Sequence, residues 1–165
     1  MDPLSALSVA AAVVQFAEYG TGIVSNAHEL YKSTSGALSE NIDLGVTAAR
    51  LQTLSGNLQE LQRRGKEGRE QGPFEQNEQV LGSICEDCVE ISEDLVERLS
   101  KLRVSEDSKH KRLSALKQAV KTVWSKEKIQ ETVEKLANLR NELNAHIPVS
   151  LRYVQQSGTK YLSRS

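Results

Sequence analysis

The 165-residue chain has few cysteines, prolines and aromatic residues: two cysteines, three prolines and 4% aromatic residues. Two cysteines do not make a disulfide framework, so the composition indicates a reducing, intracellular setting. The scarcity of aromatic residues and prolines favours helices over a β-sandwich or barrel. With 38% hydrophobic and 26% charged residues, the chain has the composition of one soluble globular domain with its own core.

An excess of charge of one sign is also absent, since the formal net charge is −1. Nothing global therefore points to nucleic acid as a partner. The charge is nevertheless uneven: residues 75–97 hold eight acids and no Lys or Arg, and residues 98–128 hold ten Lys or Arg against three acids. Two interpretations remain open, namely two helices with complementary solvated faces, or a surface for anionic lipids. The candidate lipid contacts are Lys109, Lys111, Arg112, Lys117 and Lys121.

The usual signatures of enzymes and cofactor sites are missing from the sequence. It has no phosphate-binding G-x-x-x-x-G-K-[ST] loop, no G-x-S-x-G and no H-E-x-x-H. Cys85 and Cys88 form a C-x-x-C, but it lies inside a predicted helix beside carboxylates, and a zinc site needs two further ligands. We interpret both cysteines as packing residues and expect no enzyme activity, no cofactor and no metal.

Charge is scarcest at the start of the chain, where MDPLSALSVAAAVVQFA carries only Asp2. The uncharged run 3–17 is too short to span a bilayer, which needs about 20 apolar residues. The acidic start argues against a secretory signal peptide. The run is therefore buried in a core, docked on a partner or inserted into a membrane on release. The candidate inserting residues are Leu4, Leu7, Val9, Val13, Val14 and Phe16, with Glu18 as a polar boundary or pore residue.

The spacing of apolar residues predicts an all-α fold: an antiparallel bundle of four to five helices with an additional hydrophobic N-terminal helix. We expect helices over 3–19 and 23–32, separated by Gly20 and Gly22, then from Ser39 or Glu40 to Arg64, and a flexible loop over 65–74. Further helices are expected over 75–103, after a cap at Ser105 or Asp107, and after Ser125 until Pro148 ends or kinks the last one. Residues 1–152 then form the domain, and 153–165 form a tail that begins a linker. Trp124 pins the corner between the last two helices or, alternatively, anchors the chain at a membrane interface.

Two stretches carry a resemblance to a known family. They are MDPLSALSVAAAVVQFAEYG with the following ELYKSTSG, and ALKQAVKTVWSKEKIQETVEKLANLRNELNAHIPVSLR. Both resemble the HeLo-like N-terminal domains of fungal NOD-like (STAND) receptors, which in turn resemble the executioner domain of mixed lineage kinase domain-like protein and plant RPW8-type domains. The resemblance covers about residues 1–152. It implies a helical bundle of fungal immunity that causes programmed cell death by membrane permeabilisation after oligomerisation.

Two functions follow as expectations. The first is a membrane-targeting, pore-forming or membrane-disrupting execution domain, cytoplasmic at rest and at the cell membrane on activation. Its partners are further copies of itself, anionic membrane lipids, and a STAND receptor or amyloid-signalling partner that supplies the trigger, since this chain carries neither module. The second is a protein-interaction or oligomerisation module of such a receptor, without lipid activity and with the N-terminal helix permanently in the core.

Overall fold

The computed structural model describes residues 3–32, 43–67, 75–106 and 112–162. Within those ranges the side chains described are those of residues 6–29, 31–32, 43–67, 78–103 and 118–146. These parts of the chain form five α-helices and no strand, which confirms the predicted all-α class. The helices are α1 (Pro3–Lys32), α2 (Leu44–Glu67), α3 (Glu75–Glu106), α4 (Arg112–Val123) and α5 (Lys126–Leu162).

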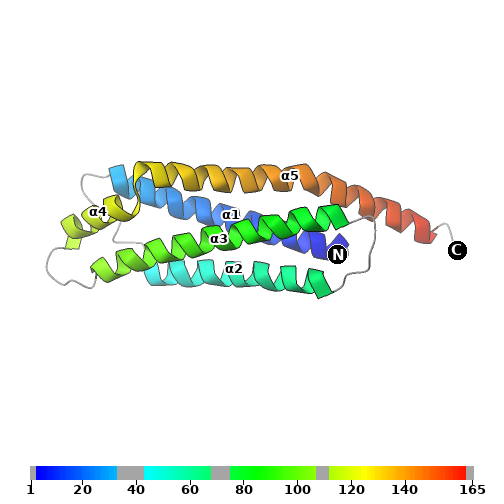
Figure 1. Cartoon of the computed structure of the whole chain (residues 1–165), viewed down its shortest axis with the longest axis horizontal. Helices are drawn as coiled ribbons and strands as arrows, with labels where there is room; N and C mark the ends of the chain where they lie inside the picture. Colours follow the sequence, from blue (N-terminus) through cyan, green and yellow to red (C-terminus); the bar gives the residue numbers. More distant parts are fainter. Residues whose placement is uncertain (1–2, 33–42, 68–74, 107–111, 163–165) are drawn as a thin grey trace.

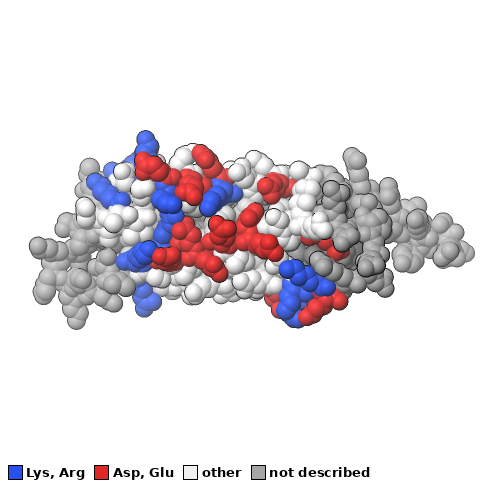
Figure 2. Space-filling model, in the orientation of Figure 1, with Lys and Arg blue, Asp and Glu red and all other residues white. Residues whose placement is uncertain are grey.

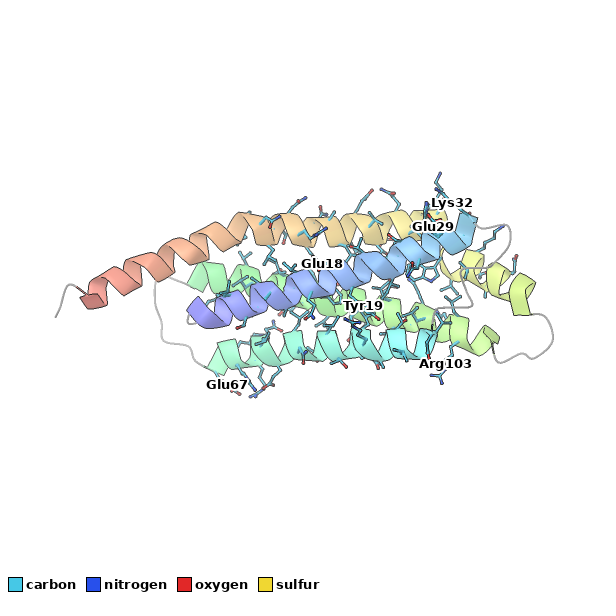
Figure 3. All side chains as sticks on the ribbon, turned by 180° about the vertical axis from the view of Figure 1, so that it is seen from behind. Glu18, Tyr19, Glu29, Lys32, Glu67 and Arg103 are labelled. Atoms are coloured by element: carbon cyan, nitrogen blue, oxygen red, sulfur yellow. The ribbon has the colours of Figure 1, made fainter. Side chains whose placement is uncertain are left out.

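Four long helices lie side by side along the long axis of the molecule, and the short α4 lies at one end (Figure 1). α1 and α3 occupy the middle, with α5 on one side of them and α2 on the other (Figures 1 and 3). Both central helices contact every other helix, whereas α2 and α5 do not contact each other in the described ranges. The two central helices therefore connect all the others.

The core is the line along which the apolar faces of the helices meet. Its largest members are fully buried, because each helix repeats apolar residues at intervals of three or four and so presents them on one side. Trp124 and Phe16 are 0% exposed and lie in the same hydrophobic cluster. The other large side chains that are almost completely buried are Leu51, Leu58, Ile84, Leu95, Leu136, Leu143, Val9, Val13, Val24 and Val120.

The predicted break of the N-terminal helix at Gly20 and Gly22 is wrong, because α1 is continuous from Pro3 to Lys32. Gly20 is buried, and a Cβ atom placed on it would lie 3.2 Å from Cδ2 of Leu136 in α5. A Cβ on Gly22 would meet nothing within 4 Å. Gly20 is therefore a point of close approach between two helices, and tertiary packing outweighs the low helix propensity of glycine.

The second helix also differs from the prediction at both ends. It begins at Leu44 and not at Ser39 or Glu40, because Asp43 caps it: the backbone N–H of Val46 donates to Asp43 Oδ1 at 2.9 Å. It continues through Gly65 to Glu67, so the loop predicted over 65–74 is wrong for its first three residues, and its remaining residues lie outside the described ranges. Ion pairs of Glu60 with Arg63 and Arg64, and of Arg63 with Glu67, support these last turns.

The remaining boundaries are partly as predicted. α3 continues to Glu106, so Ser105 lies inside it and does not cap the next helix, while Asp107 lies outside the described residues. Ser125 caps α5, because its Oγ accepts a hydrogen bond from the Lys128 N–H at 3.3 Å. Pro148 does not end α5, which runs to Leu162 and so makes residues 153–162 helical; Figure 1 shows its direction changing in its C-terminal part.

The close approach at Gly20 yields a prediction. Gly20→Leu forces side-chain atoms into space that Leu136 occupies, so we expect a loss of about 1–3 kcal/mol in the free energy of unfolding. The matched control is Gly56→Leu in α2, where a Cβ would meet nothing within 4 Å; that variant gains about 0.5–1 kcal/mol from helix propensity. Urea denaturation measures both values. Equal stabilities of the two variants would contradict the proposed contact.

Candidate functional site on the N-terminal helix

One face of α1 is an apolar stripe that packs into the core. Its residues recur at intervals of three and four, which places them on a single side of a helix. The stripe is in contact with α2, α3, α4 and α5, so it is a core face of the whole bundle. We call it the apolar stripe; it consists of Val9, Ala10, Val13, Phe16, Ala17, Gly20, Ile23, Val24 and Ala27.

The opposite face of α1 is exposed and weakly polar. Its members also recur at intervals of three and four over the described length of the helix, and three of the eight are charged. We call this face the polar stripe; it consists of Ser8, Ala11, Gln15, Glu18, Gly22, Ser25, Glu29 and Lys32. Figure 3 shows Glu18, Glu29 and Lys32 following one another along α1. Uncharged side chains thus cover the described solvent side of α1 before Glu18.

The residues predicted to insert into a membrane do not share one surface. Val9, Val13 and Phe16 lie together in the core and are at most 1% exposed, and Val14 is half-buried. Leu7 is 53% exposed and lies outside the apolar stripe. The side chain of the sixth candidate, Leu4, is outside the described residues. The resting protein therefore presents Leu7 to solvent and hides the three largest described members of the set.

Glu18 does not mark the end of a helix, because α1 continues through it to Lys32; its predicted role as a polar boundary or pore residue in a membrane stays a prediction. Its side chain is exposed on the polar stripe near the middle of α1. The next residue, Tyr19, ties α1 to α2 in two ways. Its hydroxyl donates to the carbonyl oxygen of Thr47 at 3.4 Å, and the Arg50 guanidinium carbon lies 4.8 Å from its ring centroid. Sequence spacing does not predict the pairing of Tyr19 with Arg50, because it joins residues far apart in the chain.

Trp124 lies in the core at the corner between α4 and α5, as its structural interpretation predicts. The guanidinium carbon of Arg98 is 5.0 Å from the centroid of the indole ring, a cation–π contact between α3 and this corner. Arg98 is itself only 8% exposed, and its Nη2 forms an ion pair with Asp94 Oδ2 at 2.6 Å. A side chain held in this way is not available as an interfacial anchor in the resting protein.

The candidate lipid-binding residues lie mostly outside the described side chains. Lys121 is exposed on α4, whereas Lys109 and Lys111 are outside the described ranges, as are the side chains of Arg112 and Lys117. The described acids of this stretch are exposed or half-buried along α3, and Figure 2 shows a band of acidic residues across the middle of this face of the molecule. Its described ion pairs include Lys101 with Glu97 within α3, and Lys135 of α5 with Glu90 of α3.

Cys85 and Cys88 are buried at 1% and 0% exposure, in agreement with their interpretation as packing residues. Burial, helped by the neighbouring charge of Glu86, raises the pKa of the Cys85 thiol to about 11. Burial raises the pKa of the Cys88 thiol further still, with Cys85 and Asp87 adding to the effect. Among the described residues, no group of three or more His, Cys, Asp or Glu side chains is placed to hold a metal ion.

The length of α1 changes what it can do in a membrane. Its segment Ala6–Glu29 contains 24 residues and is long and apolar enough to cross a bilayer, unlike the run 3–17 considered alone. It is the one such segment in the described part of the chain. A core helix of a soluble protein meets the same criteria of length and composition, so this finding by itself does not distinguish the two kinds of helix.

Comparison with known proteins found no match for this chain among protein-family models, curated proteins or solved structures.

The buried cysteines yield a prediction on thiol reactivity. A thiol attacks a disulfide reagent as the thiolate, which burial disfavours for both side chains. At pH 8 we expect Ellman's reagent to label the folded protein at least about a hundredfold more slowly than the guanidinium-unfolded chain. The control is Ser100→Cys on the exposed side of α3, whose added thiol reacts rapidly in the folded protein. Rapid labelling of the two native thiols would contradict their place in the core.

Proposed function

We propose that this chain is a HeLo-like, membrane-disrupting execution domain of programmed cell death, in which oligomerisation releases α1 from the core into a membrane. The observation that carries the proposal is the division of α1 into two complete faces over a length sufficient to cross a bilayer. The apolar stripe suits contact with lipid, and the polar stripe suits contact with water or with other copies of α1. A helix that served only as a core element does not need a solvent side without charge, as this one has over the described residues before Glu18.

In the proposed resting state the four long helices form an antiparallel bundle, which the order of colours along the ribbons in Figure 1 supports. The burial of α1 opposes its spontaneous release in this state. Complete burial of one large apolar side chain stabilises a protein by about 1.5–3 kcal/mol. Four side chains of α1 that are at most 1% exposed therefore represent about 6–12 kcal/mol, comparable to the net stability of a whole domain. They are Val9, Val13, Phe16 and Val24.

A membrane removes most of the free-energy cost of moving α1 out of the core. Hydrocarbon is as apolar as the protein core, so the apolar stripe exchanges one apolar environment for another on insertion. In water the same release exposes the stripe and amounts to unfolding. The proposal therefore makes α1 a conditional membrane helix, whose release needs a lipid surface and the contacts of an oligomer to replace those with α2, α3, α4 and α5.

Glu18 decides which kind of inserted state the proposal favours. The 24 residues of Ala6–Glu29 form a helix about 36 Å long, against about 30 Å of hydrocarbon, and Glu18 lies near its middle. A lone acidic side chain at the bilayer centre costs about 2.5–3.5 kcal/mol. Several copies of α1 avoid this cost if their polar stripes face one another around water. We therefore propose that Glu18 faces the lumen of an oligomeric pore.

The remaining parts of the proposal concern partners and location. The domain is cytoplasmic at rest and reaches the cell membrane on activation, where anionic lipids attract its basic residues, including the exposed Lys121. A STAND receptor or an amyloid-signalling partner supplies the oligomerising trigger. The function requires no enzyme activity, no cofactor and no nucleic acid.

A second candidate function is a protein-interaction or oligomerisation module without lipid activity. The observation that favours it is the contact of α1 with every other helix, which is the environment of a permanent core helix. Its length and composition are then explained by burial alone. The two candidates differ in one measurable respect: only the first predicts that the chain permeabilises vesicles.

Vesicle leakage tests the proposed function through Leu7. Because this side chain is 53% exposed, Leu7→Glu leaves the fold intact and changes the free energy of unfolding by less than about 0.5 kcal/mol. Leu7 is the large apolar side chain that resting α1 presents to an approaching bilayer, on the same side of the helix as Glu18. A carboxylate there is repelled by anionic headgroups and weakens this first contact before any pore forms, so we expect dye release from vesicles containing phosphatidylserine to fall at least about tenfold. The matched control is Val46→Glu, at an apolar position on α2 that is 63% exposed, and we expect this variant to leak like the wild type.

The outcome separates the two candidates because the folded state is the same in all three proteins. Each protein is fused at its C-terminus to the same oligomerising domain, which replaces the trigger that a partner supplies. Leakage by the Leu7→Glu fusion equal to that of the wild-type fusion, or no leakage by the wild-type fusion at all, contradicts the execution function. Val13→Glu and removal of residues 1–19 are unsuitable for this test. Both disrupt the core, since Val13 and Phe16 are 0% exposed, and either function predicts their failure.

Ion selectivity tests the role proposed for Glu18. A ring of carboxylates in a pore favours cations, so we expect the wild-type conductance to be cation-selective and Glu18→Gln to lose most of that preference while still conducting. The control is Glu29→Gln, which removes a charge from the same polar stripe at the end of the span and has a smaller effect. Reversal potentials across planar bilayers under a salt gradient measure the preference. Unchanged selectivity in Glu18→Gln places Glu18 outside the lumen.

A further inference from the structure

A cavity of about 210 Å³ lies where α1, the start of α2, the end of α3 and the corner after α4 meet. Its floor is apolar and buried. Its rim includes the exposed residues Glu18, Gly22 and Asn26, all from α1, so the cavity opens to solvent along that helix. The six buried floor residues are Ile23, Ala27, Leu99, Leu102, Val120 and Trp124.

The size and lining of this cavity suit a small apolar group. Protein interiors are close-packed, with few voids larger than a water molecule. An engineered apolar cavity of about 150 Å³ in another protein stays dry and binds benzene. The present cavity is larger, so its floor accommodates a substituted aromatic ring or a short branched alkyl group.

The charge at the rim selects the rest of the ligand. Glu18 is the one charged side chain among the described residues that line the cavity. Two described cations, Arg50 and Arg103, do not line it: Arg50 lies over the ring of Tyr19, and Arg103 (labelled in Figure 3) packs beside Gly45 at the start of α2. An apolar floor with a single carboxylate at its mouth complements a molecule with an apolar body and a positively charged end.

We propose that this cavity is a binding site for a small amphipathic amine, with the apolar body on the floor beside Trp124 and the ammonium group at Glu18. Half of the lining residues belong to α1, so the site exists only while α1 is packed in the bundle. A ligand that binds this arrangement and not the opened one stabilises the packed state in proportion to its occupancy. The site does not depend on the membrane activity proposed above, because it belongs to the resting bundle.

Trp124 supplies the measurement, because it is the single tryptophan of the chain and lies on the floor of the cavity. The ligand used is 4-bromobenzylamine, which is protonated at pH 7 and whose bromine quenches indole fluorescence on contact. The comparison is 4-bromobenzoate, which has the same ring and the opposite charge. We expect saturable quenching by both, with the amine binding at least about threefold more tightly.

Two glycine variants test whether quenching occurs at this site. Gly22→Leu adds a side chain at the rim, where a Cβ meets nothing within 4 Å, so it blocks the mouth without straining the fold. We expect this variant to lose saturable quenching by both compounds. Gly56→Leu, on an open surface of α2 away from the cavity, keeps it. Circular dichroism and thermal unfolding verify that both variants remain folded.

Glu18→Gln tests the recognition of charge. The substitution keeps the shape of the rim and removes its carboxylate. We expect the affinity for the amine to fall to that for the benzoate or below it, while both compounds still quench Trp124 saturably. Quenching that does not saturate, or that is equal in Gly22→Leu and wild type, overturns the site. Equal affinity of the amine and the benzoate for the wild type overturns the assignment of the ligand as an amine. None of these results depends on vesicle leakage, so this proposal and the membrane function fail separately.

Discussion

The packing of the apolar stripe of α1 against the rest of the bundle is the interaction on which the structure depends. α1 contacts all four other helices, whereas α2 and α5 do not contact each other in the described ranges. Close approach at Gly20 brings α1 against Leu136 of α5, and Tyr19 joins it to α2 through Thr47 and Arg50. Without α1, α5 keeps only its smaller contact with α3 among the described helices.

The same constraint shapes any function of α1. The side chains of α1 that stabilise the bundle are apolar, so in the proposed function the resting protein and the inserted state compete for one apolar surface. The competition is balanced only if lipid and neighbouring copies replace the contacts that are lost. The polar stripe adds a second requirement, since Glu18 is tolerated in water at rest and needs water or a partner in a bilayer. The cavity beside Glu18 also depends on this packing, because α1 supplies half of its lining residues.

The sequence predicted the helices better than their ends. Apolar spacing of three and four identified α3 and the cap at Ser125, because periodicity and capping are local properties. Two predicted helix breaks at glycines are wrong. Gly20 and Gly65 were expected to interrupt helices, yet both are buried within them, since packing against a neighbouring helix offsets the low propensity of glycine. The start of α2 was placed too early because Asp43, and neither Ser39 nor Glu40, supplies the cap.

The sequence by itself determined the all-α class and the near absence of charge at the start of the chain, because composition and period are readable without a fold. It also marked Glu18 as the first charge after that run. Only the tertiary structure decided that α1 continues past Glu18, that Val13 is buried while Leu7 is exposed, and that Glu18 borders a cavity with Trp124. These facts depend on which residues of distant helices face one another, and that pairing is settled by the packing of all the helices together.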